Sequence, residues 1–300
     1  MNRVVRHAID CGCDPLIAIQ MATINTACHF GMERELGSIT PGRRADFIVT
    51  SSINDLPIDV VFARGERVAE NGQLLTKCPH YEWPQTVRKT VNLGKKLELK
   101  DFVISVPTGL SSVKAKVIGV IENQAPTKAL EFDLPVKQGK VQVEGDVCYL
   151  SLVERHRGTG AVVNGFVSGF GYTGSMAIAS SVAHDSHHMI VVGTNQEMMA
   201  CAANRLGEVG GGVSLWKDGS EVALVELPIA GLMSDSKASD VAVKAQAIVS
   251  AMIDCGCTLN NAYMQHTLLA LVVIPELRIS DLGLVDVNRF ELTKIIETNS

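Results

Sequence analysis

The fold of the larger part of this chain is decided by one stretch, Met176-Ala177-Ile178-Ala179-Ser180-Ser181-Val182-Ala183-His184-Asp185-Ser186-His187-His188-Met189-Ile190-Val191-Val192. It begins and ends in short apolar runs, which predict two buried strands. Between them lie three histidines, a carboxylate and hydroxyl groups. Polar groups at this density are costly to bury unless they form hydrogen bonds or bind something. The stretch therefore predicts a strand, a polar loop and a second strand, with His184, Asp185, Ser186 and His187 as candidate site residues.

Two interpretations of this loop stay open. In one, Asp185 and Ser186 satisfy backbone donors and the histidines are partly solvated. In the other, the loop faces an active site and His184, Asp185 or His187 helps to close that site or touches the substrate. The spacing of His184 and His187 suits a shared metal ion only in a helix or a turn.

A second polar cluster, Glu154-Arg155-His156, follows another apolar run. Glu154 and His156 are further candidates for an active-site-facing role. The simpler interpretation is an exposed ion pair, which contributes little to stability.

The flanking sequence predicts a mixed α and β domain. Strand-like runs cover residues 115–121, 147–153 and 161–166, and Asp218-Gly219 predicts a hairpin. Thr194 with Glu197 forms a capping-box pattern, which predicts a helix from there to about Leu206. Further helices are predicted over about 237–254 and 259–272.

The first 77 residues have a different character. One helix is predicted to end at Gly12, and Asp14-Pro15 predicts the start of another, whose buried face extends to Ala27. Residues 37–75 carry turn signals, a run at 45–50 that predicts a short buried strand, and a hairpin around Arg64-Gly65. Residues 78–100 are polar and predict a linker between domains.

Length and composition limit the classes of protein to which this chain can belong. The 300 residues suffice for about two domains, and 46% of them are hydrophobic. The net charge of −5 gives no sign of nucleic-acid binding. The N-terminus lacks the apolar core of a secretion signal, and the longest apolar run, Leu268–Pro275, is too short to cross a bilayer, so we expect a cytoplasmic protein without membrane contact. The eight cysteines, including Cys11-Gly12-Cys13 and Cys255-Gly256-Cys257, are best interpreted as reduced core residues.

Residues 35–50, Glu35-Leu36-Gly37-Ser38-Ile39-Thr40-Pro41-Gly42-Arg43-Arg44-Ala45-Asp46-Phe47-Ile48-Val49-Thr50, resemble the G-x-I-x-P-G-x-x-A-D-hydrophobic segment of the amidohydrolase superfamily. In that superfamily the segment follows the last helices of a (β/α)8 barrel and forms part of a small β-sandwich. Met21-Ala22-Thr23-Ile24-Asn25-Thr26-Ala27 is similar to the A-T-x-N-x-A pattern just before it.

The second half resembles the C-terminal domain of the adenine deaminase family. The resemblance rests on the order of Glu154-Arg155-His156, residues 165–171, 181–188, Gly210-Gly211-Gly212 and residues 227–234. It covers the whole chain, although residues 78–100 match poorly and His188 stands where the family pattern has Asn. The resemblance implies hydrolytic deamination of adenine to hypoxanthine and ammonia, in which a metal-activated hydroxide attacks C6.

The resemblance also implies a ligand set for Mn or Fe: an H-x-H pair on the first barrel strand, a bridging carboxylate, two further histidines and an aspartate on the last strand. None of this set can be placed here. The histidines stand at positions 7, 29, 80, 156, 184, 187, 188 and 266, so there is no H-x-H. The sequence starts just after the strand that would carry the aspartate, as in a truncated or split gene product.

We therefore expect an α+β protein with four parts. Residues 1–34 would be late barrel helices, 35–77 a small β-sandwich unit, 78–100 a linker, and 101–300 a separate α+β C-terminal domain. Alone the chain would hold no metal and be inactive. Adenine would be the substrate of the complete enzyme, and the partner would be an N-terminal barrel half or another copy of the chain. The alternatives are a non-catalytic structural or oligomerisation module, and a stand-alone metal-binding protein that uses the His184–His188 loop.

Overall fold

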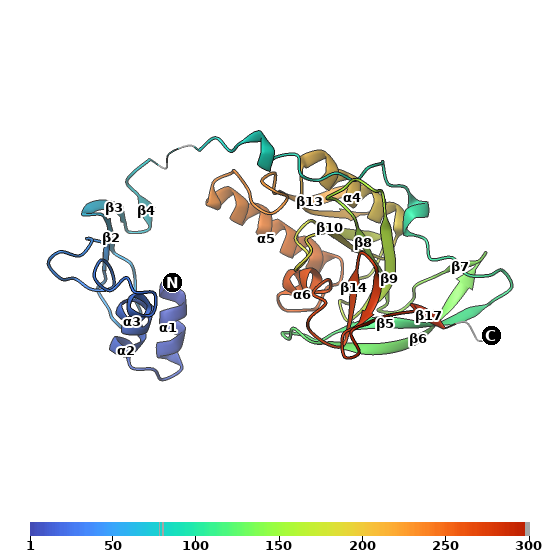
Figure 1. Cartoon of the computed structure of the whole chain (residues 1–300), viewed down its shortest axis with the longest axis horizontal. Helices are drawn as coiled ribbons and strands as arrows, with labels where there is room; N and C mark the ends of the chain where they lie inside the picture. The colour runs from blue at the N-terminus through green and yellow to red at the C-terminus, as the bar shows by residue number, and fades with distance from the viewer. Residues whose placement is uncertain (78, 80, 298–300) are drawn as a thin grey trace. The chain divides into compact units, whose positions relative to one another are not determined.

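The computed structural model describes residues 1–77, 79 and 81–297. The chain divides into two compact units, Met1–Glu82 and Trp83–Ser300 (Figure 1). The division lies within the stretch predicted as a linker. Both units combine helices with largely antiparallel strands, which agrees with an α+β class. That the first helices derive from a barrel stays a prediction.

Three short helices open the first unit: α1 (Asn2–Asp10), α2 (Pro15–Ala22) and α3 (Ile24–His29). Asp14 caps α2 as predicted, because its carboxylate accepts hydrogen bonds from the backbone N–H of Leu16 and Ile17. The single helix expected to extend to Ala27 is interrupted at Thr23, whose backbone leaves the helical region at φ −127° and ψ −95°.

A four-stranded antiparallel sheet completes this unit, in the order β1 (Phe47–Val49), β2 (Val60–Ala63), β3 (Glu66–Glu70) and β4 (Gln73–Leu74). The turn at Arg64-Gly65 has positive φ at both positions, as a tight hairpin requires, so the predicted hairpin is confirmed. The strand predicted within residues 45–50 forms as β1, but the prediction that it is buried is wrong, because Ile48 and Val49 are exposed within this unit.

The segment just after the division belongs to the second unit and packs against the rest of it. Two 3₁₀ turns, η1 (Gln85–Val87) and η2 (Leu99–Phe102), lie on this segment. Leu97 and Phe102 are fully buried, and Asn204 exchanges side-chain hydrogen bonds with both backbone groups of Leu97. The part of the predicted linker beyond Trp83 therefore contributes to the core of this unit.

The second unit is built on a ten-stranded sheet with the order β13-β12-β10-β11-β8-β9-β5-β6-β7, and β17 pairs with β5. The strands are β5 (Ser112–Val120), β6 (Thr127–Lys137), β7 (Lys140–Val141), β8 (Cys148–Val153), β9 (Val162–Ser168), β10 (Met176–Ser180), β11 (Met189–Gly193), β12 (Gly212–Lys217), β13 (Ser220–Glu226) and β17 (Ile296–Glu297). β5 runs parallel to β9, and every other neighbouring pair is antiparallel. The strand, loop and strand predicted around His184–His188 are confirmed as β10, a loop and β11.

Side chains alternate between the two faces of this sheet, as strand geometry requires. Leu150 and Leu152 of β8 pack in one core with α5 (Ala238–Asp254) and with the small sheet of β14 (Leu277–Ser280), β15 (Gly283–Asp286) and β16 (Glu291–Thr293). Tyr149 and Val153 pack in the other core, with α4 (Gln196–Val209) and the segment around Leu97. The central strands are therefore covered on both sides, which explains why they read as continuous apolar runs.

The helix after β11 begins one residue later than its capping-box pattern suggests. Asn195 is the N-cap of α4, because its side chain accepts from the N–H groups of Glu197 and Met198. Thr194 instead accepts a hydrogen bond from the N–H of Met176 and donates to the carbonyl of Gly174. The predicted helices at 237–254 and 259–272 correspond to α5 and to the shorter α6 (Ala262–Leu268).

Candidate functional site

The candidate residues gather around a buried guanidinium, that of Arg155. Arg155 follows β8 and is 1% exposed. Its Nε donates to the carbonyl of His187 at 2.5 Å, and its Nη2 lies 3.3 Å from the carbonyl of Ala230 and 3.5 Å from that of Ser181. One side chain thus ties the end of β8 to both ends of the polar loop and to the segment after β13. We call this arrangement, Arg155 with those three carbonyls, the Arg155 clamp.

Ser181 and two glycines extend the Arg155 clamp. The Oγ of Ser181 donates to the carbonyl of Gly231 at 2.6 Å and accepts from the N–H of Gly212 at 2.7 Å. A Cβ on Gly211 would lie 2.5 Å from Cα of Gly231, and one on Gly231 would lie 2.7 Å from Nη1 of Arg155. These glycines are required by close approach of backbone to backbone and to a side chain.

The carboxylate of Glu154 organises the turn that follows. It accepts hydrogen bonds from the N–H groups of His156, Arg157 and Thr159 and from the hydroxyl of Thr159. Burial alone raises the pKa of Glu154, but these hydrogen bonds outweigh burial and lower the pKa to about 2. The interpretation of residues 154–156 as an exposed ion pair is therefore wrong: Glu154 and Arg155 are both buried, and each binds backbone groups.

His156 connects the two predicted clusters. Its Nε2 lies 2.9 Å from the carbonyl oxygen of Ser186, and its ring centroid is 4.8 Å from that of His188. His188 is buried, with Nε2 3.6 Å from a carboxylate oxygen of Asp281. Burial lowers the pKa of His188, although Asp281 acts in the opposite direction. His188, the residue that we expect to depart from the family pattern, thus lies at this junction.

His184 and His187 form a second pair on the same loop, with ring centroids 5.4 Å apart. His187 has φ +50°, its N–H donates to the carbonyl of Ala183, and its Nδ1 lies 3.4 Å from the N–H of Ala183. Burial lowers the pKa of His187, and so do the nearby charges of His184 and Arg155. The imidazole of His187 is therefore held in the neutral form near pH 7.

The tip of the loop is reachable from solvent, because Asp185 and Ser186 are exposed while His184 and His187 are half-buried. The structure thus brings His156 together with the loop residues and leaves Glu154 facing its own turn. Whether any of them faces a substrate stays a prediction.

The described residues were also compared for groups of side chains that could bind a metal ion. Among residues 1–77, 79 and 81–297, no three His, Cys, Asp or Glu side chains converge so that they could hold a metal ion. The described residues thus do not assemble the Mn or Fe ligand set that the family resemblance implies, and the expectation that this chain alone holds no metal stays a prediction. No helix in the same residues has the length and apolar character needed to cross a membrane.

Comparison with known families finds matches in both units of the chain. Residues 124–291 match the family described as the adenine deaminase C-terminal domain, and residues 1–68 match the amidohydrolase family. This chain belongs to the adenine deaminase family. The four segments joined by the Arg155 clamp and Ser181 all lie in the part that matches the adenine deaminase C-terminal domain.

Curated relatives extend the similarity over nearly the whole chain. An adenine deaminase of Ruegeria pomeroyi is 69% identical over 300 residues, which cover 99% of this chain and 50% of that protein. An adenine deaminase of Moorella thermoacetica is 43% identical over 298 residues, with the same two shares. The chain spans about half the length of the curated relatives it matches.

Sequence reasoning missed the central role of Arg155. The signals were present in separate places: an arginine two residues after the end of a mostly apolar strand, a run of three glycines, and a serine just after β10. None of these signals specifies which carbonyls the guanidinium meets, because its partners come from segments up to 75 residues away.

Proposed function

We propose that this chain forms the C-terminal part of a metal-dependent adenine deaminase, which as a complete enzyme converts adenine and water to hypoxanthine and ammonia in purine salvage. The observation that carries the proposal is the 69% identity to a protein named adenine deaminase over 99% of this chain. We place the complete enzyme in the cytoplasm.

The chain needs a second polypeptide segment for this activity. We assign the Mn or Fe ions of the complete enzyme to residues outside this chain, because the described residues offer no converging set of ligands. The segment that supplies them corresponds to the half of the relatives that this chain does not cover. By itself, this chain is therefore inactive.

Within the complete enzyme, we assign the loop from His184 to His187, with His156, to the edge of the active site. The support is that the Arg155 clamp fixes both ends of this loop while its tip stays accessible. A fixed loop with an accessible tip can present side chains to a ligand at low entropic cost. His187, held neutral near pH 7, can accept or donate one hydrogen bond there.

The test is reconstitution. The purified chain is stripped of metal and assayed for ammonia release from adenine, alone and after mixing with the first half of the Ruegeria pomeroyi enzyme and Mn²⁺. We expect turnover in the mixture and none from either half alone. Turnover by the stripped chain alone would contradict the proposal, and so would an inactive mixture in which the two halves demonstrably associate.

The same preparations separate the alternatives. Stable oligomers of the chain that never bind the other half would favour a structural module. Metal that co-purifies with the chain and disappears in His187→Ala would favour a stand-alone metal-binding protein.

A further inference from the structure

The second unit has an open pocket whose walls come from the segment before η2 and from α4, β12 and β13. Its volume is about 470 Å³, within the range of about 300–1,000 Å³ that is usual for small-molecule sites. The residues that line it include Lys96, Cys201, Asn204, Arg205, Trp216 and Glu221. We call it the Trp216 pocket. None of its residues belongs to the Arg155 clamp or to the loop from His184 to His187, so the proposed function leaves it unused.

Hydrogen bonds and ion pairs hold two walls of the Trp216 pocket in place. Asn204 accepts from the N–H of Leu97 and donates to the carbonyl of Leu97, both at 2.9 Å. The guanidinium of Arg205 lies between two carboxylates, 2.9 Å from Oε2 of Glu221 and 3.2 Å from Oε2 of Glu208, which also lines the pocket. Walls that are already fixed lose little conformational freedom when a ligand binds.

Trp216 supplies a flat apolar wall. Its side chain is half-buried, and its Nε1–H donates to Oγ of Ser214 at 3.0 Å, which fixes the indole ring. The ring can therefore offer its π surface to a planar aromatic ligand. Stacking of a base on such a ring contributes about 1–3 kcal/mol.

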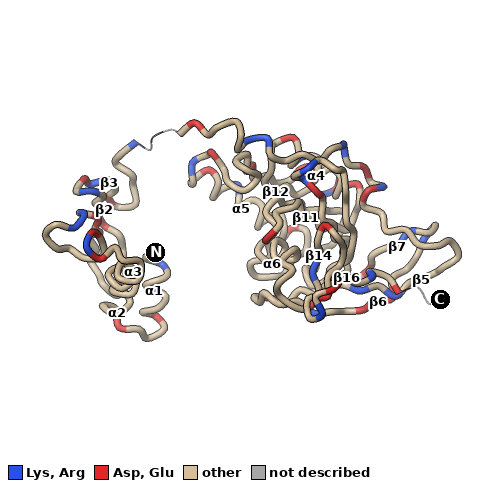
Figure 2. Tube along the Cα trace, in the orientation of Figure 1, with Lys and Arg blue, Asp and Glu red and all other residues tan. Residues whose placement is uncertain are grey.

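The polar groups of the Trp216 pocket include both donors and acceptors. Glu208 and Glu221 contact Arg205 through Oε2, so Oε1 of each can accept a hydrogen bond from a ligand. Two other lysines of the segment before α4 pair with carboxylates, but among the residues that the structure describes Lys96 pairs with none. Basic and acidic residues also occur together at α4 in Figure 2. Because two cations and two carboxylates line the pocket, it suits a neutral ligand with donors and acceptors rather than an ion.

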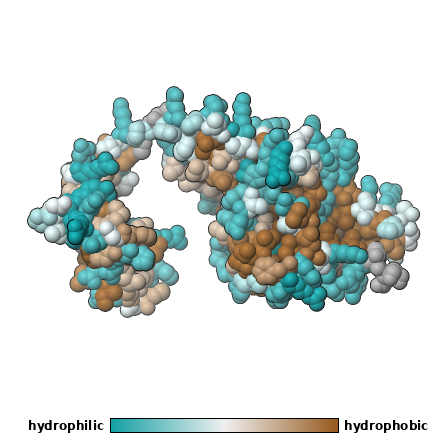
Figure 3. Space-filling model, in the orientation of Figure 1, coloured by the Kyte–Doolittle hydropathy of each residue, from teal (hydrophilic) through white to brown (hydrophobic). Residues whose placement is uncertain are grey.

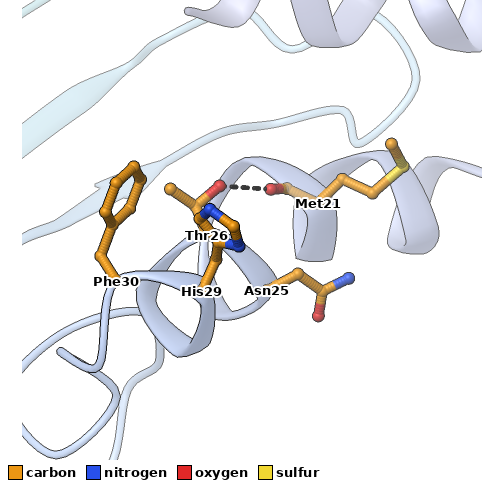
Figure 4. A pocket seen from close by; sticks show the side chains of 5 residues that line it. All are labelled: Met21, Asn25, Thr26, His29 and Phe30. Atoms are coloured by element: carbon orange, nitrogen blue, oxygen red, sulfur yellow. Dashed lines mark hydrogen bonds between the residues drawn. The ribbon is translucent and has the colours of Figure 1, made fainter.

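The surroundings favour a small polar ligand over an apolar partner. Figure 3 shows mainly hydrophilic residues at α4, whereas hydrophobic residues gather lower in the same unit. An open pocket in the first unit differs: Met21, Asn25, Thr26, His29 and Phe30 line it, and none of them is Lys, Arg, Asp or Glu (Figure 4). There Met21 is 58% and Phe30 70% exposed, and the hydroxyl of Thr26 already donates to the carbonyl of Met21. The paired donors and acceptors are a property of the Trp216 pocket.

We propose that the Trp216 pocket binds a purine base, stacked on the indole, with N–H groups of the base donating to Glu208 or Glu221 and a ring nitrogen accepting from Lys96. A purine base is planar, and its edge carries both donors and acceptors. The choice of a purine among such heterocycles rests on the function proposed above, since adenine and hypoxanthine are the substrate and the product of that reaction.

Equilibrium dialysis of the metal-stripped full chain against radiolabelled adenine or hypoxanthine measures this binding without turnover. Trp216→Leu removes the stacking surface, and Lys96→Met removes the ammonium at an exposed position. Lys100→Met is the matched control, because Lys100 is also exposed and close in sequence but does not line the pocket. Circular dichroism checks the folding of each variant, and the exposed Lys96 keeps the test valid if Trp216→Leu does not fold.

We expect the unaltered chain to bind adenine with a dissociation constant below about 1 mM. Trp216→Leu should weaken binding at least about tenfold, Lys96→Met at least about threefold, and the control less than about twofold. An absence of binding by the unaltered chain would overturn the proposal, as would equal affinity for all four proteins. Tighter binding of adenosine monophosphate than of adenine would overturn the choice of a neutral ligand.

Alkylation of Cys201 reports on the same pocket in the unaltered chain. Cys201 is half-buried and lines the pocket, while Cys11 and Cys28 are exposed residues of the first unit. Bound adenine should slow labelling of Cys201 by N-ethylmaleimide at least about threefold, followed by mass spectrometry, and should protect neither Cys11 nor Cys28. Unchanged labelling of Cys201 with adenine bound would place the ligand elsewhere and overturn the proposal.

The outcomes for this pocket and for the proposed function are distinguishable. Purine binding that Lys96→Met weakens, together with an inactive mixture of associated halves, supports the Trp216 pocket and contradicts the proposed function. An active mixture made with a chain that by itself binds no purine supports the function and overturns the Trp216 pocket.

Discussion

Replacing Arg155 by alanine should be among the most damaging single changes in the second unit. The substitution removes the donor that serves the part-buried carbonyls of His187 and Ala230, and it also removes the longer contact to the buried carbonyl of Ser181. Leaving a buried carbonyl without its partner costs about 1–3 kcal/mol, and the space left by the side chain adds to this. The 3.5 Å contact is weak, so we expect a total loss of about 3–5 kcal/mol.

Urea unfolding of the full chain followed by tryptophan fluorescence measures this loss directly. Both tryptophans, Trp83 and Trp216, belong to the second unit, so the signal reports on that unit. Arg157→Ala is the control, because Arg157 is close in sequence but exposed, and it should change stability by less than about 0.5 kcal/mol. Arg155→Lys should recover little, since an ammonium cannot reproduce the planar donor geometry of the guanidinium. A loss below about 1 kcal/mol in Arg155→Ala would refute the Arg155 clamp as an organising element.

Two further predictions concern the same region. Gly231→Ala should cost about 2–4 kcal/mol in the same urea assay, because its φ is +71° and its Cβ would lie 2.7 Å from Nη1 of Arg155. The control is Gly219→Ala, which has φ +85° but no atom within 4 Å of the added Cβ, and it should cost about 1 kcal/mol. Equal losses of stability in the two variants would argue against the close approach of Gly231 to Arg155. The depressed pKa of Glu154, about 2 in the folded chain, contributes stability above pH 4.5 that is lost as the pH falls toward 2. Between pH 6 and pH 3 we expect this contribution to fall by roughly 2 kcal/mol, and a Glu154→Gln variant with an unchanged pH dependence would show that another group is responsible.

Local patterns were sufficient for most helices and strands, because the forces that shape them act over a few residues. Asp14-Pro15 started a helix since both residues satisfy requirements of its first turn. The turn at Asp218-Gly219 joined β12 to β13 for a similar reason. The long strand β6 had no such signal, because Pro135 and charged residues interrupt its apolar pattern. Its partner β5 holds it in place through an extended antiparallel ladder.

Patterns failed where a tertiary partner displaced the local one. Thr194 had the spacing of a capping residue, yet its hydroxyl bonds to the backbone of Gly174 and Met176 across the β10–β11 pair. Glu154 and Arg155 were interpreted as part of an exposed ion pair, yet in the structure each forms hydrogen bonds with backbone groups. A short motif shows which hydrogen-bonding groups are present, but which of them form hydrogen bonds depends on the tertiary structure.

The sequence by itself determined the family, the α+β class, and the polar loop between two buried strands, since each of these depends on residue order or on the periodicity of apolar side chains. The tertiary structure alone decided that Arg155 fixes that loop and that α2 exposes an apolar surface. The physical reason is that hydrogen-bond partners and burial depend on distances between segments far apart in the chain. Those distances exist only once the strands have paired and the cores have formed.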